Sequence, residues 1–231
     1  MVKLVGRSFA AYLLDISTTD KVVMMARLTP HARREAIIDA ALVVARRKGI
    51  GATTARDVAA EMHTSSGLIH HYFSSMDDLL AAAFAKAADV DLDFTDAAVN
   101  AVEGGIAKLG AFFASYEQLD GDWGYQLWFD AWSEAARHPV LQQTSQRLNL
   151  TWQHRLRSII IAGVDERVFT CPDADAVAWR VLSMLDGLAL QVVAHPDALK
   201  YEVVMPWSMR FAETELGLPS GTLRLAGCLD E

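Results

Sequence analysis

Cysteine is scarce in this chain of 231 residues: Cys171 and Cys228 are the two present, and they lie far apart. Two cysteines at this separation form no disulfide framework and match no zinc-binding spacing, so we expect no metal site and a reducing, cytoplasmic environment. Long apolar runs are also missing, because none approaches the roughly 18 residues that a membrane-spanning helix needs. Residues 1–25 hold a short apolar stretch that Asp15 interrupts, which we interpret as a flexible N-terminal arm.

Signatures of catalysis are absent from the sequence as well. It contains no G-x-S-x-G, no H-E-x-x-H, no phosphate loop and no dinucleotide-binding fingerprint. His70 and His71 are adjacent, so on a helix they point in different directions and cannot hold one metal ion together. His138, His154 and His195 have no spacing typical of a metal site. We therefore expect neither an enzyme nor a cofactor.

Positive charge is in deficit, since the formal net charge is −8. The deficit is uneven along the chain. Residues 26–86 contain 8 Lys and Arg against 6 Asp and Glu, with four His in addition, whereas residues 87–231 contain 10 against 21. The first segment is therefore mildly basic, as a nucleic-acid-binding domain requires, and two copies side by side would bind DNA better than one.

The chain is organised around residues 53–80, where two short helices and the start of a third are predicted in quick succession. Thr54 and Asp57 form a T-x-x-D capping box, and Ser75 and Asp78 form an S-x-x-D box. Ser65 is the expected N-cap of the helix between them, after a turn at His63. A helix, a tight turn and a second short helix with small polar residues at its start are typical of a helix-turn-helix.

A recognition helix needs small polar or thin apolar side chains on the face that enters the major groove. We expect base-edge contacts from Ser66, Gly67 and Leu68. Contacts to the phosphate backbone are expected from Thr54, Ser65, His70 and His71, because helix N-termini and hydrogen-bond donors favour phosphate. An ordinary three-helix corner without a role in DNA binding is the alternative interpretation.

The segment from Arg33 to Phe84 resembles the DNA-binding domain of the tetracycline-repressor (TetR) family, and its G-L-I-H-H-Y-F run most resembles the BetI-like branch. The matching residues are Ala40-Ala41, Gly51, Thr54, Val58-Ala59, Ser65, Gly67, Phe73 and Leu79-Leu80. The sequence departs from the family at His63, often Gly, at His70, often Tyr, and at Met76, often Lys. The resemblance implies a homodimer that binds an operator through two recognition helices.

Helical periodicity continues through the rest of the chain, so the predicted fold class is all-α: an N-terminal three-helix helix-turn-helix domain and a larger helical domain. Further helices are expected at about 30–48, 76–101, 106–118, 123–137, 139–162, 170–194 and 197–216, with Pro206 a kink or a break. The predicted boundaries are a DNA-binding domain at 26–86, a ligand-binding and dimerisation domain at 87–217, and a loose tail at 218–231.

Aromatic residues gather between residues 112 and 152, and they have two interpretations. One is plain core, since aromatics at helical spacing usually pack inside. The other is a ligand pocket between helices, where aromatic faces and a carboxylate suit an organic cation. The candidate ligand-binding residues are Phe112, Tyr116, Trp128, Trp132 and Trp152 with the carboxylate of Asp130; Glu134 and Asp186 are further sources of negative charge.

Two apolar helices at about 172–194 and 197–216 remain, and the TetR resemblance assigns them to the dimer; intrachain core is the alternative. The predicted function is a ligand-responsive repressor that binds a palindromic operator as a homodimer and is released by a small-molecule inducer. The helix from Met76 would transmit ligand binding as a rigid lever. Alternatives are a regulator or architectural DNA-binding protein without a ligand, whose second domain only dimerises, and an all-α enzyme or carrier with a vestigial helix-turn-helix.

Overall fold

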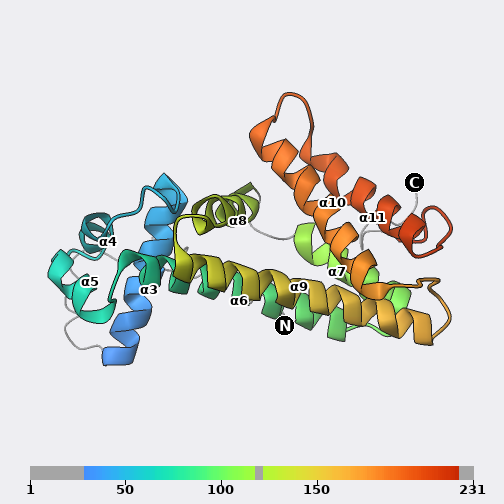
Figure 1. Cartoon of the computed structure of the whole chain (residues 1–231), viewed down its shortest axis with the longest axis horizontal. Helices are drawn as coiled ribbons and strands as arrows, with labels where there is room; N and C mark the ends of the chain where they lie inside the picture. Colours follow the sequence, from blue (N-terminus) through green and yellow to red (C-terminus); the bar gives the residue numbers. More distant parts are fainter. Residues whose placement is uncertain (1–28, 118–121, 224–231) are drawn as a thin grey trace, which may run out of the picture. The chain divides into compact units, whose positions relative to one another are not determined.

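The structure, a computed structural model, describes residues 29–117 and 122–223 (Figure 1). Within these ranges the chain forms nine α-helices and one short 3-10 helix and no strand, which confirms the all-α prediction. The helices are α3 (Pro30–Lys48), α4 (Ala55–Glu61), α5 (Ser66–Tyr72), α6 (Met76–Asn100), α7 (Gly105–Glu117), α8 (Asp122–Ala135), α9 (Pro139–Asp165), α10 (Ala174–Ala194), η1 (Tyr201–Val203) and α11 (Val204–Glu215). The predicted N-terminal arm and most of the predicted C-terminal tail lie outside the described residues.

Contacts divide the chain into two compact units. The first unit comprises the described residues up to Ala87 together with Asp130–Ser145; the second comprises Ala88–Phe129 and the described residues from Gln146 onward. Helices α6, α8 and α9 each have one end in the first unit and the other end in the second. The domain boundary near residue 86 stays a prediction, and the grouping of Asp130–Ser145 with the first unit was not part of it.

Local side-chain hydrogen bonds start the helices of the first unit. The Thr54 hydroxyl accepts the backbone N–H of Asp57 at 3.2 Å, and the Asp57 carboxylate accepts that of Thr54 at 3.2 Å, which completes the predicted capping box. Ser75 accepts the N–H of Asp78 at 3.0 Å in the same way at the start of α6. Ser65 takes the N-cap position of α5, but its hydroxyl forms no capping bond.

The turn between α4 and α5 depends on one residue in the left-handed region, His63, with φ 51°. Glycine adopts this region at lower cost than any residue with a Cβ atom, which accounts physically for the glycine that the TetR family often has there. The turn brings α4 and α5 together around a shared apolar core. Its most buried members are Ile37, Ala41, Val44, Val58, Ile69 and Leu79, with Phe73 beside them.

Two glycines set the separation of α7 and α9 in the second unit. A Cβ atom on Gly105 would lie 2.6 Å from the Cα of Gly163, and one on Gly163 would lie 2.1 Å from the Phe169 ring. Helices α7 and α9 therefore approach closely because Gly105 carries no side chain, and the Phe169 ring packs against α9 because Gly163 carries none. Between α6 and α7, the buried hydroxyls of Thr95 and Ser115 share a hydrogen bond of 2.8 Å.

The last two helices begin differently from the prediction. The helix expected from about residue 170 starts at Ala174 after the N-cap Asp173, whose carboxylate accepts the N–H of Ala176 at 3.0 Å. The helix expected from residue 197 is divided, and α11 starts only at Val204 after η1. Pro206 then lies in the first turn of α11, where its missing N–H has no helical partner to lose. Helix α10 packs against α11.

Residues 218–223 are held against α11, although we expected the tail to be loose from residue 218. The nearly fully buried carboxylate of Glu213 accepts the backbone N–H groups of Gly221 at 3.0 Å and Leu223 at 2.8 Å. An accepting carboxylate that bonds two backbone donors satisfies groups that would otherwise be costly to bury. The rest of the predicted tail lies outside the described residues.

Among the described helices, α10 is long and apolar enough to cross a membrane by length and composition alone. The sequence-based statement that no segment approaches this length was therefore too strict. A single such helix is weak support for a membrane span, because core helices pass the same test. Val177, Val181 and Leu185 on α10 are buried within the protein, as in a core helix.

Candidate DNA-binding surface and ligand site

The predicted DNA-contacting residues lie on α4, α5 and their N-caps, and all of them are exposed except Leu68, which is half-buried. Gly67 is open: a Cβ atom there would meet nothing closer than the Ser65 hydroxyl oxygen at 3.6 Å. His71 packs edge-on against Tyr72, with ring centroids 5.2 Å apart. Ser65, Ser66, Gly67 and His70 thus present small or donor groups to solvent, which is the surface that a groove-binding helix needs.

The basic residues at the end of α3 are partly neutralised by α4. Lys48 pairs with Asp57 at 2.7 Å and Arg47 with Glu61 at 2.8 Å. Arg56 of α4 is exposed, and the described residues offer it no carboxylate partner. The sequence-based reasoning did not single out Arg56, although its place two residues after the Thr54 cap, in the first turn of α4, could have done so. Its charge is available for a phosphate.

The end of α8 holds the turn between α3 and α4. The Asp130 carboxylate accepts the N–H of Ile50 at 3.2 Å. Gly49, with φ 83°, and Gly51 leave room for this approach, because a Cβ atom would lie 2.9 Å from the Asp130 oxygen and 2.5 Å from a Glu134 oxygen, respectively. We call this set of five residues, Gly49 to Gly51 with Asp130 and Glu134, the α8 clamp. It couples α8 to the helix-turn-helix within the first unit.

The start of α9 is fixed to α6 in the same unit. The Asp77 carboxylate accepts the N–H groups of Val140 at 3.2 Å and Leu141 at 3.3 Å, and so caps α9 from another helix. His138 lies 3.7 Å from Asp77 and 3.4 Å from Glu134. The acidic cap is favourable at a helix N-terminus because it complements the helix dipole.

Three of the predicted ligand-binding residues form a buried aromatic cluster between α7 and α9 in the second unit. The ring centroids of Phe112 and Tyr116 lie 5.3 Å apart, those of Tyr116 and Trp152 5.1 Å, and those of Phe112 and Trp152 6.0 Å. Trp128 lies on α8 in the same unit and is half-buried. Trp132 and Asp130 belong to the first unit, where Asp130 takes part in the α8 clamp.

Two carboxyl groups on other helices lie within electrostatic reach of this aromatic cluster. Burial raises the pKa of Asp91, on α6, to about 7, and burial raises that of Asp186, on α10, to about 7. The pKa of Tyr116 is raised well above its ordinary value, chiefly by burial and further by the charges of Asp186, Tyr125 and Asp91. Aromatic faces with acids whose charge lacks a counter-ion can bind a cation.

Asp186 was considered as a source of charge from the sequence, but Asp91 was missed as one of several acids on α6. Helical spacing could have separated them, because Asp91 lies three residues after buried Ala88 and four before buried Thr95, whereas Asp89 and Asp93 are exposed. Clusters of three or more possible metal ligands are not found among the described side chains.

Comparison with known proteins identifies both parts of the chain. Residues 37–83 match the family of bacterial regulatory proteins called the tetR family, and residues 111–217 match the BetI-type transcriptional repressor C-terminal family. The HTH-type transcriptional regulator BetI of Rhizobium meliloti is 30% identical over 163 residues, which cover 69% of this chain and 77% of that protein. The chain belongs to the TetR family.

A further curated relative is similar in sequence, and two solved structures are similar in fold. The HTH-type nicotine-responsive transcriptional repressor HdnoR of Paenarthrobacter nicotinovorans is 25% identical over 178 residues, 74% of this chain and 89% of that protein. A solved transcriptional regulator of Saccharomonospora viridis, in complex with choline, has a TM-score of 0.73 at 22% identity and covers 80% of this chain and 98% of its own. A solved transcriptional regulator from Pseudomonas aeruginosa PAO1 has a TM-score of 0.72 at 22% identity and covers 88% of this chain and 100% of its own.

As a TetR-family protein with a BetI-type C-terminal half, the chain is a transcriptional regulator of the repressor type and not an enzyme. Members of the family bind DNA operators and respond to small molecules. The exposed residues of α4 and α5 lie within the segment that matches the tetR family, and the buried aromatic cluster of α7 and α9 lies within the segment that matches the BetI-type family.

Proposed function

We propose that this TetR-family repressor binds a palindromic operator as a homodimer and is released from it by an organic cation. The observation that carries the ligand class is the set of buried rings of Phe112, Tyr116 and Trp152 with the carboxyl groups of Asp91 and Asp186 nearby. A cation gains from the negative faces of the rings and supplies the counter-ion that both acids lack.

The chemistry of similar proteins supports the same class. Choline, present in the Saccharomonospora viridis structure, is a quaternary ammonium ion, and nicotine carries a basic amine that is largely protonated near neutral pH. Both present a compact positive charge with an apolar surround. Such an ion loses less on desolvation than a primary ammonium, so aromatic walls can replace its water.

The ligand class can be tested with choline, tetramethylammonium and nicotine against 3,3-dimethylbutan-1-ol, the uncharged counterpart of choline. At least one of the cations should raise the thermal unfolding midpoint, because a ligand that binds only the folded state stabilises it by mass action. The uncharged alcohol should produce a much smaller shift at the same concentration. Equal shifts for choline and the alcohol would mean that charge is not recognised.

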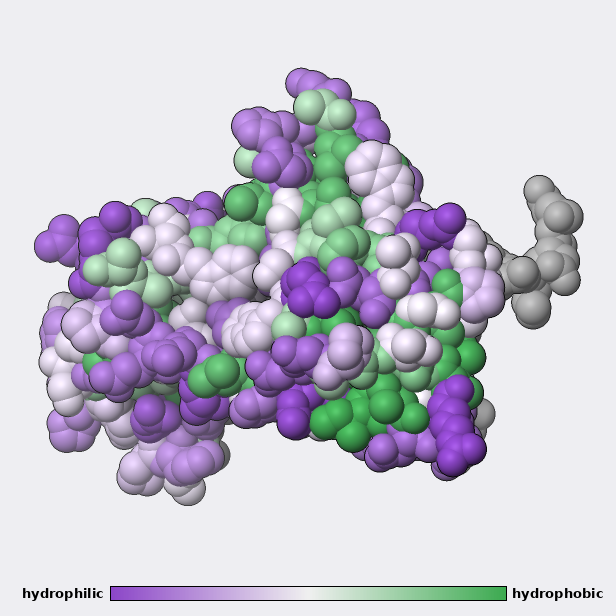
Figure 2. Space-filling view, turned by 45° about the vertical axis from the view of Figure 1, so that its right-hand side comes forward, coloured by the Kyte–Doolittle hydropathy of each residue, from purple (hydrophilic) through white to green (hydrophobic). Residues whose placement is uncertain are grey.

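Exposed apolar side chains on the last two helices support the homodimer. Trp179 and Leu190 of α10 are 39% and 44% exposed, and Trp207 of α11 is 49% exposed. Gly187 of α10 has open space around its Cα, so a second helix can approach there. Figure 2 shows one face of the molecule, on which apolar surface reaches solvent between polar residues. Large apolar side chains exposed on adjacent helices are typical of protein interfaces.

The dimer can be tested by placing a charge on this surface. Leu190→Asp should shift the protein from dimer to monomer in sedimentation velocity at micromolar concentration, because an unpaired carboxylate would be buried in the interface. Val90→Asp is the matched control: Val90 is 62% exposed on α6, outside the proposed interface, and its variant should stay dimeric. A wild-type monomer, or a dimer that survives Leu190→Asp, would contradict the proposed interface.

Release from DNA follows from the spacing of the two recognition helices. They must lie about 34–36 Å apart to enter successive major grooves. Helix α6 carries Asp91 in the second unit and starts in the first; α8 starts in the second unit and ends at the α8 clamp. A ligand that favours a different separation of these helix ends shifts the dimer away from the DNA-bound state. In this mechanism α8 acts as a second lever beside α6.

This mechanism predicts that the cation and the operator weaken each other's binding. A typical coupling of about 1–3 kcal/mol corresponds to roughly 5- to 150-fold weaker operator binding when the ligand site is filled. Fluorescence anisotropy of a labelled operator, titrated at saturating cation, measures the factor. If the cation binds and operator affinity is unchanged, the second unit serves dimerisation alone, which is the ligand-independent regulator that the sequence left open.

A further inference from the structure

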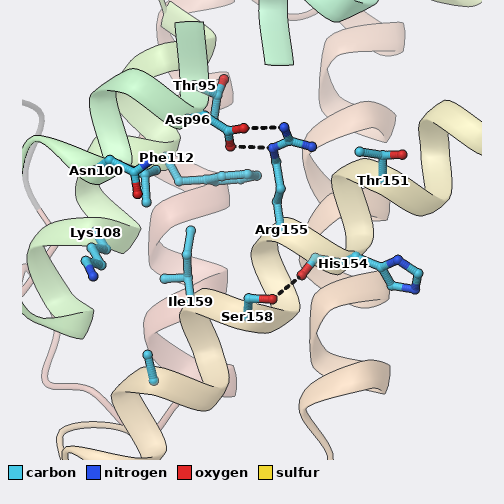
Figure 3. Close-up of a pocket in the computed structure, with 12 residues that line it drawn as sticks. Thr95, Asp96, Asn100, Lys108, Phe112, Thr151, His154, Arg155, Ser158 and Ile159 are labelled. Carbon is cyan, nitrogen blue, oxygen red and sulfur yellow. Dashed lines mark hydrogen bonds and ion pairs between the residues drawn. The ribbon is translucent and has the colours of Figure 1, made fainter. Parts of the chain in front are cut away.

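The second unit contains a pocket of about 400 Å³ beside the aromatic cluster (Figure 3). Its walls come from one face each of α6, α7 and α9, and they include Asp96 and Asn100 of α6, Lys108 and Phe112 of α7, and Arg155 and Ile159 of α9. This volume suits a metabolite-sized ligand.

The charges of the pocket do not cancel. Arg155 donates from Nε and Nη2 to the two carboxylate oxygens of Asp96, so this acid and this base neutralise each other, as the dashed lines in Figure 3 show. Lys108 is half-buried, and the described part of the chain provides no carboxylate partner for its ammonium group. One positive charge is therefore left to face the pocket, and burying it without a counter-ion is unfavourable.

The remaining walls indicate which other groups a ligand needs besides an anionic group that pairs with Lys108. Val99, Phe112, Ile159 and Ala162 supply apolar surface, and the exposed amide of Asn100 supplies a hydrogen-bond donor on the same side of the pocket as Lys108 in Figure 3. The imidazole of His154 points away from Lys108 in that view. A ligand with an apolar body and one anionic end can contact the apolar residues with its body and Lys108 and Asn100 with its anionic end.

We infer that this pocket binds a small organic carboxylate, with its anionic group on Lys108 and Asn100 and its apolar body on Phe112 and Ile159. The site is chemically opposite to the proposed cation site, so it does not depend on that proposal. Phe112 is shared: its ring contacts Tyr116 and Trp152 of the aromatic cluster at 5.3 and 6.0 Å and also lines the pocket. Filling the pocket therefore acts on the wall of the cation site.

The test uses calorimetric titration of the full chain with phenylacetate and hexanoate, each against its neutral amide, and with inorganic phosphate. At least one carboxylate should bind more tightly than its amide. Lys108→Gln should weaken that carboxylate roughly 10- to 100-fold, as expected for a lost charge-assisted hydrogen bond, and should leave the amide unchanged. Lys108→Arg should keep most of the affinity because it keeps the charge.

Lys200→Gln is the matched control, since it removes the same charge in the same unit from a lysine that bonds the Pro196 carbonyl at 2.7 Å; it should bind like the wild type. The inference is overturned if neither carboxylate binds better than its amide, or if folded Lys108→Gln binds like the wild type. Phosphate binding as tight as that of phenylacetate, with the same dependence on Lys108, would also overturn it, because the apolar walls would then contribute nothing.

Discussion

Replacing Gly67 by tryptophan should abolish specific operator binding while leaving the fold and the dimer intact. Gly67 is exposed in the first turn of α5, and its φ is not in the left-handed region, so a side chain is compatible with the backbone. The nearest atom to an added Cβ is 3.6 Å away, an ordinary contact. An indole at this position would occupy the space that base pairs must take when the helix enters the groove.

Operator duplexes for this experiment can be selected from random sequences with the wild-type protein. Specific complexes are commonly about 1,000-fold or more tighter than non-specific ones, so Gly67→Trp should bind the selected operator at least roughly 1,000-fold more weakly, at the level of unrelated DNA. Gly67→Ala should be intermediate. Ser133→Trp, at an exposed position of α8, is the control for bulk and should bind normally. Unchanged operator affinity of Gly67→Trp would show that α5 is not the reading helix.

A phosphate contact should behave differently from a base contact. Loss of His70 or Arg56 would weaken binding to all duplexes alike, because the backbone carries no sequence information. A bulky side chain at Gly67 keeps α5 away from the base edges, so the variant should lose the preference for the selected operator over unrelated DNA. The comparison of selected and unrelated duplexes therefore distinguishes the two proposed groups of residues in one experiment.

The parts of the molecule that could be predicted from the sequence depend on local interactions. The capping box of Thr54 and Asp57 joins residues three positions apart, so its pattern is visible in the sequence and its geometry follows from helix physics. The buried positions of Ile69 and Phe73 follow from helical periodicity in the same way.

The parts that could not be predicted depend on contacts between distant residues. Asp130 was assigned to the ligand because it lies among aromatic residues, but its carboxylate accepts a hydrogen bond from Ile50, 80 positions away in the chain. The sequence does not show that α8 begins in one unit and ends in the other. It also does not show that Gly49 and Gly51 leave room for the carboxylates of Asp130 and Glu134. The role of Asp91 was hidden for a different reason: Asp89 and Asp93 on both sides of it are exposed, and the half-buried Asp91 differs from them only when the helical face is followed.

The pKa values of Asp91 and Asp186 make ligand-free stability and cation affinity respond to pH in opposite directions. Both values are about 7 in the folded protein, above the ordinary value of 3.8. The folded state therefore binds more protons than the unfolded state between about pH 4 and pH 7, and the free energy of unfolding falls as pH rises through that range. A cation needs the charged carboxylates, so its affinity rises over the upper part of the same range.

Asp186→Asn should separate these two effects. The amide keeps the shape of the side chain but cannot ionise, so the ligand-free variant should be more stable than the wild type at pH 8, where a buried charge is removed. Its affinity for choline or tetramethylammonium, whichever gives the larger thermal shift on the wild type, should fall about 100-fold at pH 8, since loss of one partner of a buried ion pair costs about 3 kcal/mol or more.

Both probes carry a permanent charge, so any dependence on pH belongs to the protein. Below pH 7 the carboxyl groups must lose their protons before the cation can bind. The affinity of the wild type should therefore fall roughly tenfold per pH unit for each carboxyl group that is protonated, and Asp186→Asn should show a shallower dependence because one titrating group is gone. Asp93→Asn, which removes an equal charge from an exposed position of α6, should match the wild type in stability, affinity and pH dependence. If Asp186→Asn binds the cation as the wild type does at every pH, this carboxylate does not face the ligand, and the organic-cation proposal would rest on Asp91 and the aromatic rings alone.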